Sequence, residues 1–255
     1  MTNFYHVYQQ GFHQEVCDEL VALGEKVFMS PMYEDAQAVA QAVMQRVRYN
    51  IGLIVPRLHT LGYRFGEGMW GSEDEVSPEE RLMFEKDVPI FGVLTENTPI
   101  FIQKLEGLIG SLPLSLLHWY QEVGCVNFVG LFPSDEKRVF HRQDGCDVDP
   151  LLIYSVELVY KMVLGYKEGN VWEKDPTLPV SPDNLHKYDY SGAGPYVIHM
   201  PCKAFDAPLL KERHNTTFIN YLRICMQWGG FPGLEQHNKL SREEFTFLTK
   251  DVLPF

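Results

Sequence analysis

The chain has 255 residues with 34 acidic and 22 basic side chains, a formal net charge of −12. Apolar residues make up 45% of it and charged residues 22%, values near the globular average that exclude a mainly disordered or fibrous protein. The longest apolar runs fall short of the ~20 residues that a membrane helix needs. So negative a chain does not attract nucleic acid or anionic membranes, and its charge favours a basic protein as partner.

The cysteines and the first residues bear on the compartment. Five cysteines are widely spaced and form no CxxC pair. The N-terminus lacks the positive charge, apolar stretch and small-residue cleavage site of a signal peptide. We therefore expect reduced thiols and a cytoplasmic location.

Residues 1–65 are predicted to form an all-helical segment. Apolar residues recur at helical spacing over Val16–Val27 and, in a longer stripe, over Ala36–Leu61. Pro56 falls inside the second helix, where its ring would clash with the carbonyl group of Gly52. We therefore expect a kink or a break at Pro56.

Residues 66–96 are a connector rich in glycine, proline and acidic residues, and a domain boundary would fall here. Its start, Gly66–Gly71, matches the GxGxxG pattern of dinucleotide-binding sites. Such a site needs a strand before the glycines and a helix after them. Here a helix precedes and an acidic stretch follows, so we expect a loop-like linker that binds no nucleotide.

Residues 97–255 are predicted to form an α+β domain that opens with two helices. Thr98–Pro99 starts the first helix, which ends near Gly110, and Pro113 opens the second, which ends at Gly124. The nearly continuous apolar run after Gly124 predicts a strand buried on both faces. Because one glycine turn joins this helix to the strand, four side chains should share one core: Leu116, Trp119, Val123 and Phe128.

The remainder alternates strands and loops before it returns to helix. Residues 151–154 and 196–200 predict strands, separated by a stretch that proline and glycine punctuate. Phe218–Cys225 marks one helical face, and Ser241 with Glu244 makes a capping box for a last helix. This order of elements favours an α+β fold, with a mixed or antiparallel sheet packed by helices.

Side chains that could bind a metal gather in one loop: His141, Asp144, Cys146, Asp147 and Asp149. Their spacing matches neither a Cys/His zinc pair nor the Asp-rich calcium loop, which predicts a solvated acidic turn. His118, His199 and His214 are interpreted as surface or structural histidines. The chain has no GxSxG elbow, HExxH or Walker lysine. We therefore predict no catalytic residue, no metal and no cofactor.

The stretch Trp228–Gly233 reads WGGFPG and follows the helix over Phe218–Cys225. Aromatic side chains most often fill cores. A rigid glycine turn is also a good place to display an aromatic side chain to a partner. On that second interpretation Trp228 and Phe231 are the candidate partner-binding residues.

Residues 112–128, LPLSLLHWYQEVGCVNF, resemble the start of a SUKH-type domain, with Leu-Pro, a helix bearing aromatics and a glycine turn into a strand. That superfamily includes fungal cell-wall-assembly regulators, the Syd protein and many bacterial immunity proteins. Later segments resemble an uncharacterised bacterial group more closely: Ser181–Lys187, Ser191–Tyr196, Asp206–Leu210, His214–Arg223 and Trp228–Gly233. The resemblance covers roughly residues 98–235. It departs at Gly124–Cys125, where many members have two glycines.

The resemblance implies an α+β fold and protein binding, in bacteria often the neutralisation of a toxin, and it implies no catalytic residues. With the charge, it predicts a non-enzymatic, cytoplasmic protein-binding module, in its specific form an immunity protein against a basic toxin. The alternative is a hydrolase or transferase that uses scattered His, Asp and Glu. A deep pocket with converging titratable groups would favour the enzyme. A shallow acidic surface with an exposed aromatic would favour the binding protein.

Overall fold

The computed structural model describes residues 3–66, 92, 94–133, 147–169, 176–188, 192, 194–237 and 239–255. Its α-helices are α1 (Phe4–Gln9), α2 (His13–Ala22), α3 (Met32–Thr60), α5 (Thr98–Ile109), α6 (Leu114–Glu122), α8 (Val156–Glu168), α9 (Phe218–Gln227) and α10 (Arg242–Thr249). Short 3₁₀-helices are η1 (Gly24–Phe28), η3 (His186–Tyr188) and η4 (Pro232–Gln236). None of the described helices is both long and apolar enough to cross a membrane.

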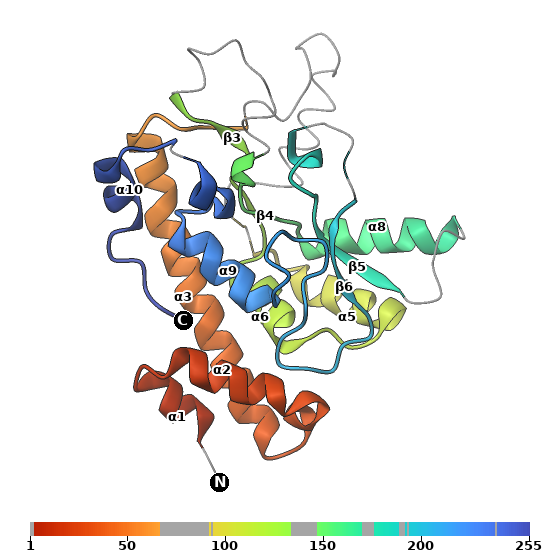
Figure 1. The fold of residues 1–255 in the computed structure, drawn as a ribbon. Helices are drawn as coiled ribbons and strands as arrows, with labels where there is room; N and C mark the ends of the chain where they lie inside the picture. The colour runs from red at the N-terminus through yellow and green to blue at the C-terminus, as the bar shows by residue number, and fades with distance from the viewer. Residues whose placement is uncertain are drawn as a thin grey trace.

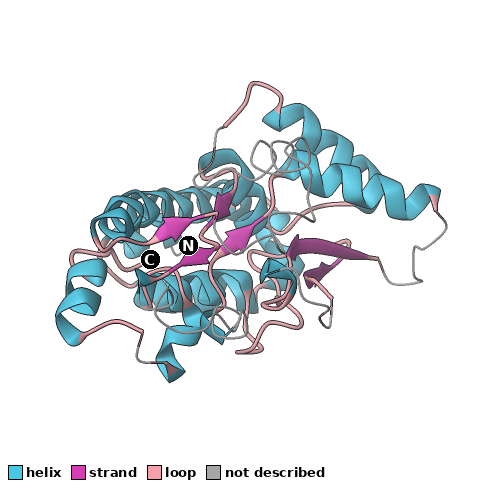
Figure 2. Cartoon of the chain, turned by 90° about the horizontal axis from the view of Figure 1, so that it is seen from above, coloured by secondary structure: helices cyan, strands magenta, loops and turns pink. Residues whose placement is uncertain are grey.

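The strands are short and pair in twos. They are β1 (Arg64–Phe65), β2 (Val126–Asn127), β3 (Gly130–Leu131), β4 (Leu152–Ile153), β5 (Thr177–Ser181) and β6 (Tyr196–His199). In the described residues β1 pairs with β3, β2 with β4 and β5 with β6, each antiparallel. The fold is therefore α+β, as expected, and small antiparallel pairs take the place of one larger sheet. Figure 2 shows one group of short strands between helices and a further strand pair beside them, next to loops.

Helix α3 is the longest of the described helices and runs along one side of the fold (Figure 1). The short helices α1 and α2 pack at its N-terminal end, and α6, α9 and α10 contact it along its length. On the other side of α6, α5 packs against α8. Residues 1–65 share a hydrophobic core with the rest of the chain, because buried side chains of α3, α6 and α9 belong to one cluster.

A strand pair also joins the N-terminal helices to the α+β part. Arg64 pairs with Leu131, and Phe65 with Gly130. The approach is close, since a Cβ atom on Gly130 would lie 2.2 Å from the carbonyl oxygen of Arg64. The hydrophobic core therefore does not divide at the connector. Nearly all of that connector, including the glycines of the GxGxxG match after Gly66, lies outside the described residues.

Of the kink or break expected at Pro56, the break is wrong, because α3 is continuous through this residue. Pro56 and Gly52 both lie on the exposed side of the helix, where the carbonyl group that loses its hydrogen bond can be hydrated. Ile54 and Leu58, on the opposite side, are fully buried. Packing of that apolar face stabilises the helix more than one proline weakens it.

Helix α8 and strand β5 are among the elements missed from the sequence. Helix α8 begins at Ser155, whose Oγ accepts a hydrogen bond from the backbone N–H of Leu158 at 3.2 Å. It buries Val156, Val159 and Val163, a helical spacing. Strand β5 contains a proline and was interpreted as loop. Proline is tolerated there because β5 has only β6 as a partner among the described strands, and an edge strand leaves some N–H groups unpaired.

The helix α6 and the strand after it form the centre of the core. Leu116, Trp119, Val123 and Phe128 are all at most 1% exposed and belong to one cluster. The turn between them uses Gly124 at a positive φ of 86°, which glycine adopts without strain. Trp119 Nε1–H donates to the carbonyl oxygen of Gly124 at 3.1 Å, so the largest core side chain also holds the turn.

Phe231 is part of this core, so its assignment as an exposed partner anchor is wrong. Its side chain is 0% exposed and packs among aromatic rings, with ring centroids 5.0 Å from Phe132 and 5.2 Å from Tyr63. Trp228 is half-buried and packs on Phe245 of α10 at 5.3 Å. The glycine turn directs Phe231 inward because Gly230 lies directly against the ring of Phe128, where a Cβ atom would be 2.3 Å away.

Candidate functional site

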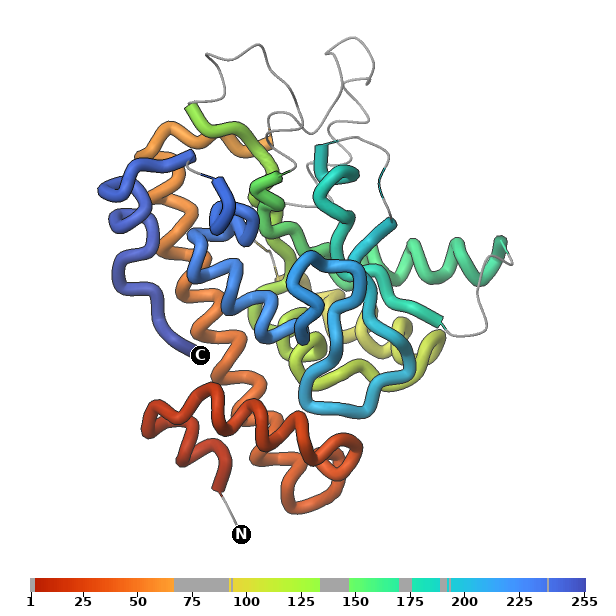
Figure 3. The backbone as a smooth tube through the Cα atoms, viewed as in Figure 1, coloured from red at the N-terminus to blue at the C-terminus, as the bar shows by residue number. Residues whose placement is uncertain are grey.

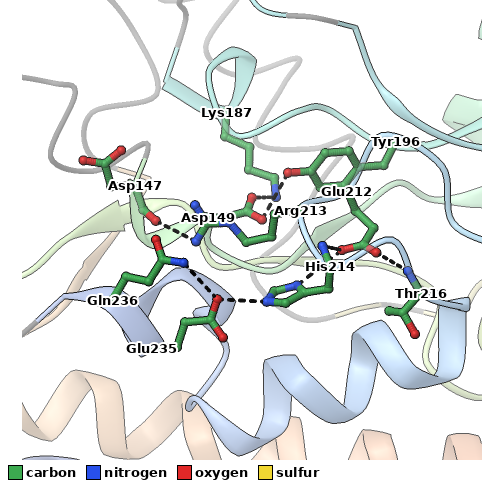
Figure 4. A network of polar contacts seen from close by, with 10 residues as sticks. All are labelled: Asp147, Asp149, Lys187, Tyr196, Glu212, Arg213, His214, Thr216, Glu235 and Gln236. Atoms are coloured by element: carbon green, nitrogen blue, oxygen red, sulfur yellow. Dashed lines mark hydrogen bonds and ion pairs between the residues drawn. The ribbon is translucent and has the colours of Figure 1, made fainter.

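A network of charged side chains lies between η3, β6 and the loops around them (Figure 4). At its centre Lys187 Nζ lies 2.6 Å from Asp149 Oδ1, and both side chains are 0% exposed. The hydroxyl group of Tyr196 donates to Asp149 Oδ2 at 3.1 Å. Lys187 Nζ also lies 5.0 Å from the centroid of the Tyr196 ring. Both oxygens of the buried carboxylate therefore have a donor.

These three residues join three segments that are far apart in sequence. Asp149 precedes β4, Lys187 lies in η3 and Tyr196 begins β6. Burial and the neighbouring Asp149 carboxylate raise the pKa of the Tyr196 hydroxyl, so it remains a donor. The buried pair has no surface to meet a ligand in this conformation. Its chemistry is that of an internal cross-link, since a buried charge is tolerated when it is paired and hydrogen-bonded.

The solvated acidic turn predicted for residues 141–149 is wrong for Asp149. That residue is fully buried and adopts a positive φ of 49°, a region that Asp tolerates better than most residues. Asp147 is exposed, as expected. His141, Asp144 and Cys146 lie outside the described residues. Among the described residues no group of three His, Cys, Asp or Glu side chains could hold a metal ion.

A second part of the network surrounds Glu212, whose side chain is wholly buried. Its carboxylate accepts hydrogen bonds from the backbone N–H groups of Thr216 at 2.5 Å and His214 at 2.6 Å. His214 Nδ1 lies 3.3 Å from Glu212, and its Nε2 lies 3.1 Å from Glu235 Oε1 (Figure 4). His214 thus bridges a buried and a half-exposed carboxylate, which agrees with a structural histidine.

The remaining histidines differ in their surroundings. His199 is exposed. His118 is 7% exposed, and neither of its ring nitrogens has a hydrogen-bond partner in the described part of the chain. Burial lowers the pKa of His118, with Glu122 opposing the effect. A buried, neutral and unpaired ring is neither a surface histidine nor a satisfied one.

Burial raises the pKa of three cysteine thiols in the described part of the chain, those of Cys17, Cys202 and Cys225. Cys17, Cys125 and Cys225 are buried. Burial raises the pKa of the Cys17 thiol to about 11, although Arg223 opposes it. The thiolate, not the thiol, is the nucleophile. Cys17 therefore stays protonated near neutral pH and acts as a core residue.

The outer face of α2 is the most acidic exposed surface on the N-terminal helices. Six acidic residues and one basic residue lie among residues 1–40: Glu15, Asp18, Glu19, Glu25, Glu34 and Asp35, against Lys26. Val16, Cys17 and Leu20 bury the opposite face of the helix. A large apolar side chain is exposed directly before this helix, since Phe12, its N-cap residue, is 51% exposed. We call the surface of Phe12, Glu15, Asp18, Glu19 and Val21 the α2 face.

A cleft of about 430 Å³ lies beside the α2 face. Its walls come from the start of α2, the end of α9 and the last residues: Gly11, His13, Gln14, Glu15, Arg223, Met226, Gln227 and Val252–Phe255. Burial lowers the pKa of His13, and Arg46 and Arg223 add to the effect. The lining therefore combines a neutral imidazole, a guanidinium group and apolar side chains.

No protein-family model, curated protein or solved structure matches the chain. Function therefore has to be argued from the residues themselves. The four predicted core residues lie together as expected, whereas neither the α2 face nor the buried pair of Asp149 and Lys187 was predicted. The α2 face had a detectable signal, since exposed helix positions 15, 18 and 19 are all acidic. The pairing of Asp149 with Lys187 had none, because nothing in a single sequence brings two residues 38 positions apart together.

Proposed function

We propose that the chain is a protein-binding module that captures a basic protein through the α2 face. The observation that carries the proposal is the juxtaposition of a half-exposed Phe12 with Glu15, Asp18 and Glu19 on a helix whose other face is buried. Acidic side chains speed and orient the encounter with a basic partner, and a desolvated aromatic supplies affinity. Phe12 takes the anchoring role that the sequence analysis gave to Trp228 and Phe231.

The resemblance to SUKH-type domains supports the same class of function. Its members bind proteins, and the bacterial immunity proteins among them neutralise toxins. A basic toxin is the partner that a net charge of −12 favours. The α2 face lies outside the residues 98–235 that carry the resemblance, so the N-terminal helices would add the partner contact to a SUKH-like body.

The alternative of a hydrolase or transferase has weaker support. The strongest charged cluster, Asp149 with Lys187, is closed to solvent. The Cys17 thiol, next to the cleft at His13, has a raised pKa. A nucleophile, a base and an oxyanion donor would have to converge on an open site.

The test is affinity capture from a lysate of the native host, followed by measurement of the association rate of the captured protein. The double variant Asp18→Lys/Glu19→Lys should slow association, and Phe12→Ala should accelerate dissociation. A matched control, Glu96→Lys/Glu168→Lys, makes the same change in net charge at exposed residues of other elements. The control should retain more of the association rate than the α2 double variant.

The salt dependence of the association rate gives a second comparison between the wild type and the α2 double variant. Charge steering falls as salt screens interactions beyond ~10 Å at 0.1 M. The association rate of the wild type should therefore fall with salt more steeply than that of Asp18→Lys/Glu19→Lys. Equal rates for the two double variants would remove the α2 face from the proposal. Tight binding of DNA or RNA at physiological salt would contradict the proposal as a whole.

A further inference from the structure

The segment Lys250–Phe255 runs back along α3 after α10 ends. Figure 3 shows it as a tube beside the long helix, with its end near the middle of α3. The reversal occurs at Asp251, which has a positive φ of 58°. Contacts proceed in opposite directions along the two chains, from Arg57 to Arg46 on the helix and from Lys250 to Pro254 on the segment.

The helix holds this segment by its backbone. Asn50 forms a double hydrogen bond with Leu253, accepting from its N–H at 2.8 Å and donating to its carbonyl oxygen at 2.9 Å. Arg46 donates to the carbonyl oxygen of Pro254 at 2.9 Å, and Arg57 donates to that of Lys250. Arg223 of α9 donates from Nε to the backbone oxygen of Phe255 at 2.5 Å. We call Arg46, Asn50, Arg57 and Arg223 the seat.

Backbone recognition of this kind does not depend on most of the side chains in the segment. Lys250, Asp251, Leu253 and Pro254 are exposed, and Val252 is half-buried. Phe255 alone is buried, at 5% exposure, with the Arg223 guanidinium 5.9 Å from its ring centroid. The segment is thus held as an extended peptide ligand is held, by main-chain hydrogen bonds and one aromatic anchor.

Asn50 indicates that the seat is built for such a ligand. It is 0% exposed in the middle of α3, where the helix's own backbone groups are already paired. A buried amide without partners would cost free energy. Both of the hydrogen bonds recorded for its side chain go to Leu253. The amide therefore selects an extended backbone at this place.

We propose that the seat is a binding site for an extended segment of a partner protein, and that residues 250–255 occupy it in cis. The partner segment presents an N–H and a carbonyl group of one residue to Asn50 and an aromatic side chain two residues later. The cleft of about 430 Å³ runs along the open side of residues 252–255 and gives the incoming segment access. The seat has no residue in common with the α2 face, although Glu15 of that face lines the cleft, and the inference does not depend on the proposal made for that surface.

The probe is a synthetic peptide of residues 250–255, KDVLPF, added to the full chain. Hydrogen exchange reports on the Leu253 amide, which donates to Asn50. A segment held by few contacts opens locally, so this amide should exchange faster than the Leu222 amide inside α9. Excess peptide should displace the segment and accelerate exchange at Leu253 but not at Leu222. Exchange of both amides at one rate, unaffected by peptide, would overturn the proposal.

A shortened chain that ends at Thr249 measures affinity directly. It should bind the labelled peptide in fluorescence anisotropy more tightly than the full chain does, because its seat is empty. Asn50→Ala should weaken this binding about tenfold, the factor that corresponds to a hydrogen bond of ordinary strength. A peptide N-methylated at the leucine cannot donate to Asn50 and should bind equally weakly. The matched control Gln45→Ala, at an exposed position on α3, should leave binding unchanged.

The outcomes separate the possible occupants. A folded shortened chain that ignores the peptide, or binds the N-methylated form as well as the parent, contradicts the proposal. The full chain could instead form concentration-dependent dimers that the peptide dissociates. That result would assign the seat to a second copy of the chain and overturn the assignment to a foreign partner. If the shortened chain does not fold, the exchange rates at Leu253 in the full chain decide.

Discussion

Two buried polar residues, Asp149 of the loop-rich half and His118 of the helical half, have opposite surroundings. Asp149, between strands, has Lys187 and Tyr196 on its two oxygens. His118, in the middle of α6, is nearly as buried and has no hydrogen-bond partner among the described residues. His13, at the start of α2, likewise has an unpaired Nε2.

The difference follows from where free backbone groups occur. Inside a helix every N–H and carbonyl group is already bonded, so a polar side chain on the buried face of a packed helix meets no backbone partner. Loops keep spare groups, and Glu212 uses two of them. Asn50 of α3 fits the rule, because its partner is the non-helical Leu253. Glu212 and Asn50 are therefore satisfied by non-helical backbone. Asp206 in the loop-rich half departs from this pattern, because its Oδ1 has no hydrogen-bond partner among the described residues.

The largest expected effect is at the buried ion pair. Lys187→Met should lower the free energy of unfolding by about 3–5 kcal/mol, because it leaves the Asp149 carboxylate buried without its countercharge. Chemical denaturation monitored by tryptophan fluorescence measures the change. If the variant unfolds no more easily than the wild type, the pair does not hold the three segments together.

Two controls keep this measurement specific. Lys161→Met removes an exposed pair with Glu157 on α8 and should cost at most about 1 kcal/mol. The double variant Lys187→Met/Asp149→Leu removes both charges and should recover part of the loss. No recovery would show that the backbone conformation at Asp149, rather than the charge, makes the position sensitive.

The next effect concerns Asp183, a second saturated carboxylate of the loop-rich half. Its oxygens accept from the backbone N–H groups of Leu185, His186 and Gly194 at 2.8–2.9 Å, and the His186 ring lies 2.9 Å away. Asp183→Asn replaces an acceptor with a donor that faces other donors. We expect a loss of about 2 kcal/mol at pH 7, within the range of hydrogen bonds to charged groups.

The pH dependence of that loss has a definite sign. Burial tends to raise the pKa of Asp183, but the hydrogen bonds from His186 and Gly194 outweigh it and lower the pKa below 3.8. A depressed carboxyl pKa stabilises the fold above the unfolded value, and this stabilisation disappears as pH falls through the folded value. The gap between wild type and Asp183→Asn should therefore close below about pH 3.8. A gap that stays constant down to pH 2 would contradict the role of the charge.

Local signals made most of the helices predictable from the sequence. The capping box of Ser241 and Glu244, in which each side chain accepts a hydrogen bond from the other residue's backbone N–H, begins α10 as expected. Gly124 ends α6 in the left-handed conformation. These features depend on residues a few positions apart, and helix periodicity reports such neighbours directly. Strand β5 was missed because its proline, Pro179, is a local signal of a loop, whereas its pairing with β6 is not local.

The candidate sites could not be predicted as well, because each depends on contacts between distant segments. Phe231 follows a glycine turn that suggests display, and only the position of Phe128, far back in the chain, makes it a core residue. Asn50 gives no signal in a helical stripe until Leu253 lies against it. Residues that bind backbone rather than each other leave no paired pattern in the sequence.

The smallest effect has the opposite sign and tests the helical half. His118→Leu removes a buried ring without hydrogen bonds, so it should raise the free energy of unfolding by about 1 kcal/mol at pH 7. Burial lowers the pKa of His118 below 6.5, so the unfolded chain binds more protons than the folded one just below that pH. The free energy of unfolding of the wild type therefore decreases as pH falls through 6.5. The variant has no imidazole at this position, so it does not show this part of the decrease.

Denaturation at pH 7 and pH 5 measures the difference between the two proteins, in which the similar effect of His13 cancels. The advantage of His118→Leu should be larger at pH 5 than at pH 7. A variant that is less stable than the wild type, with a gap that ignores pH, would mean that the imidazole has a partner.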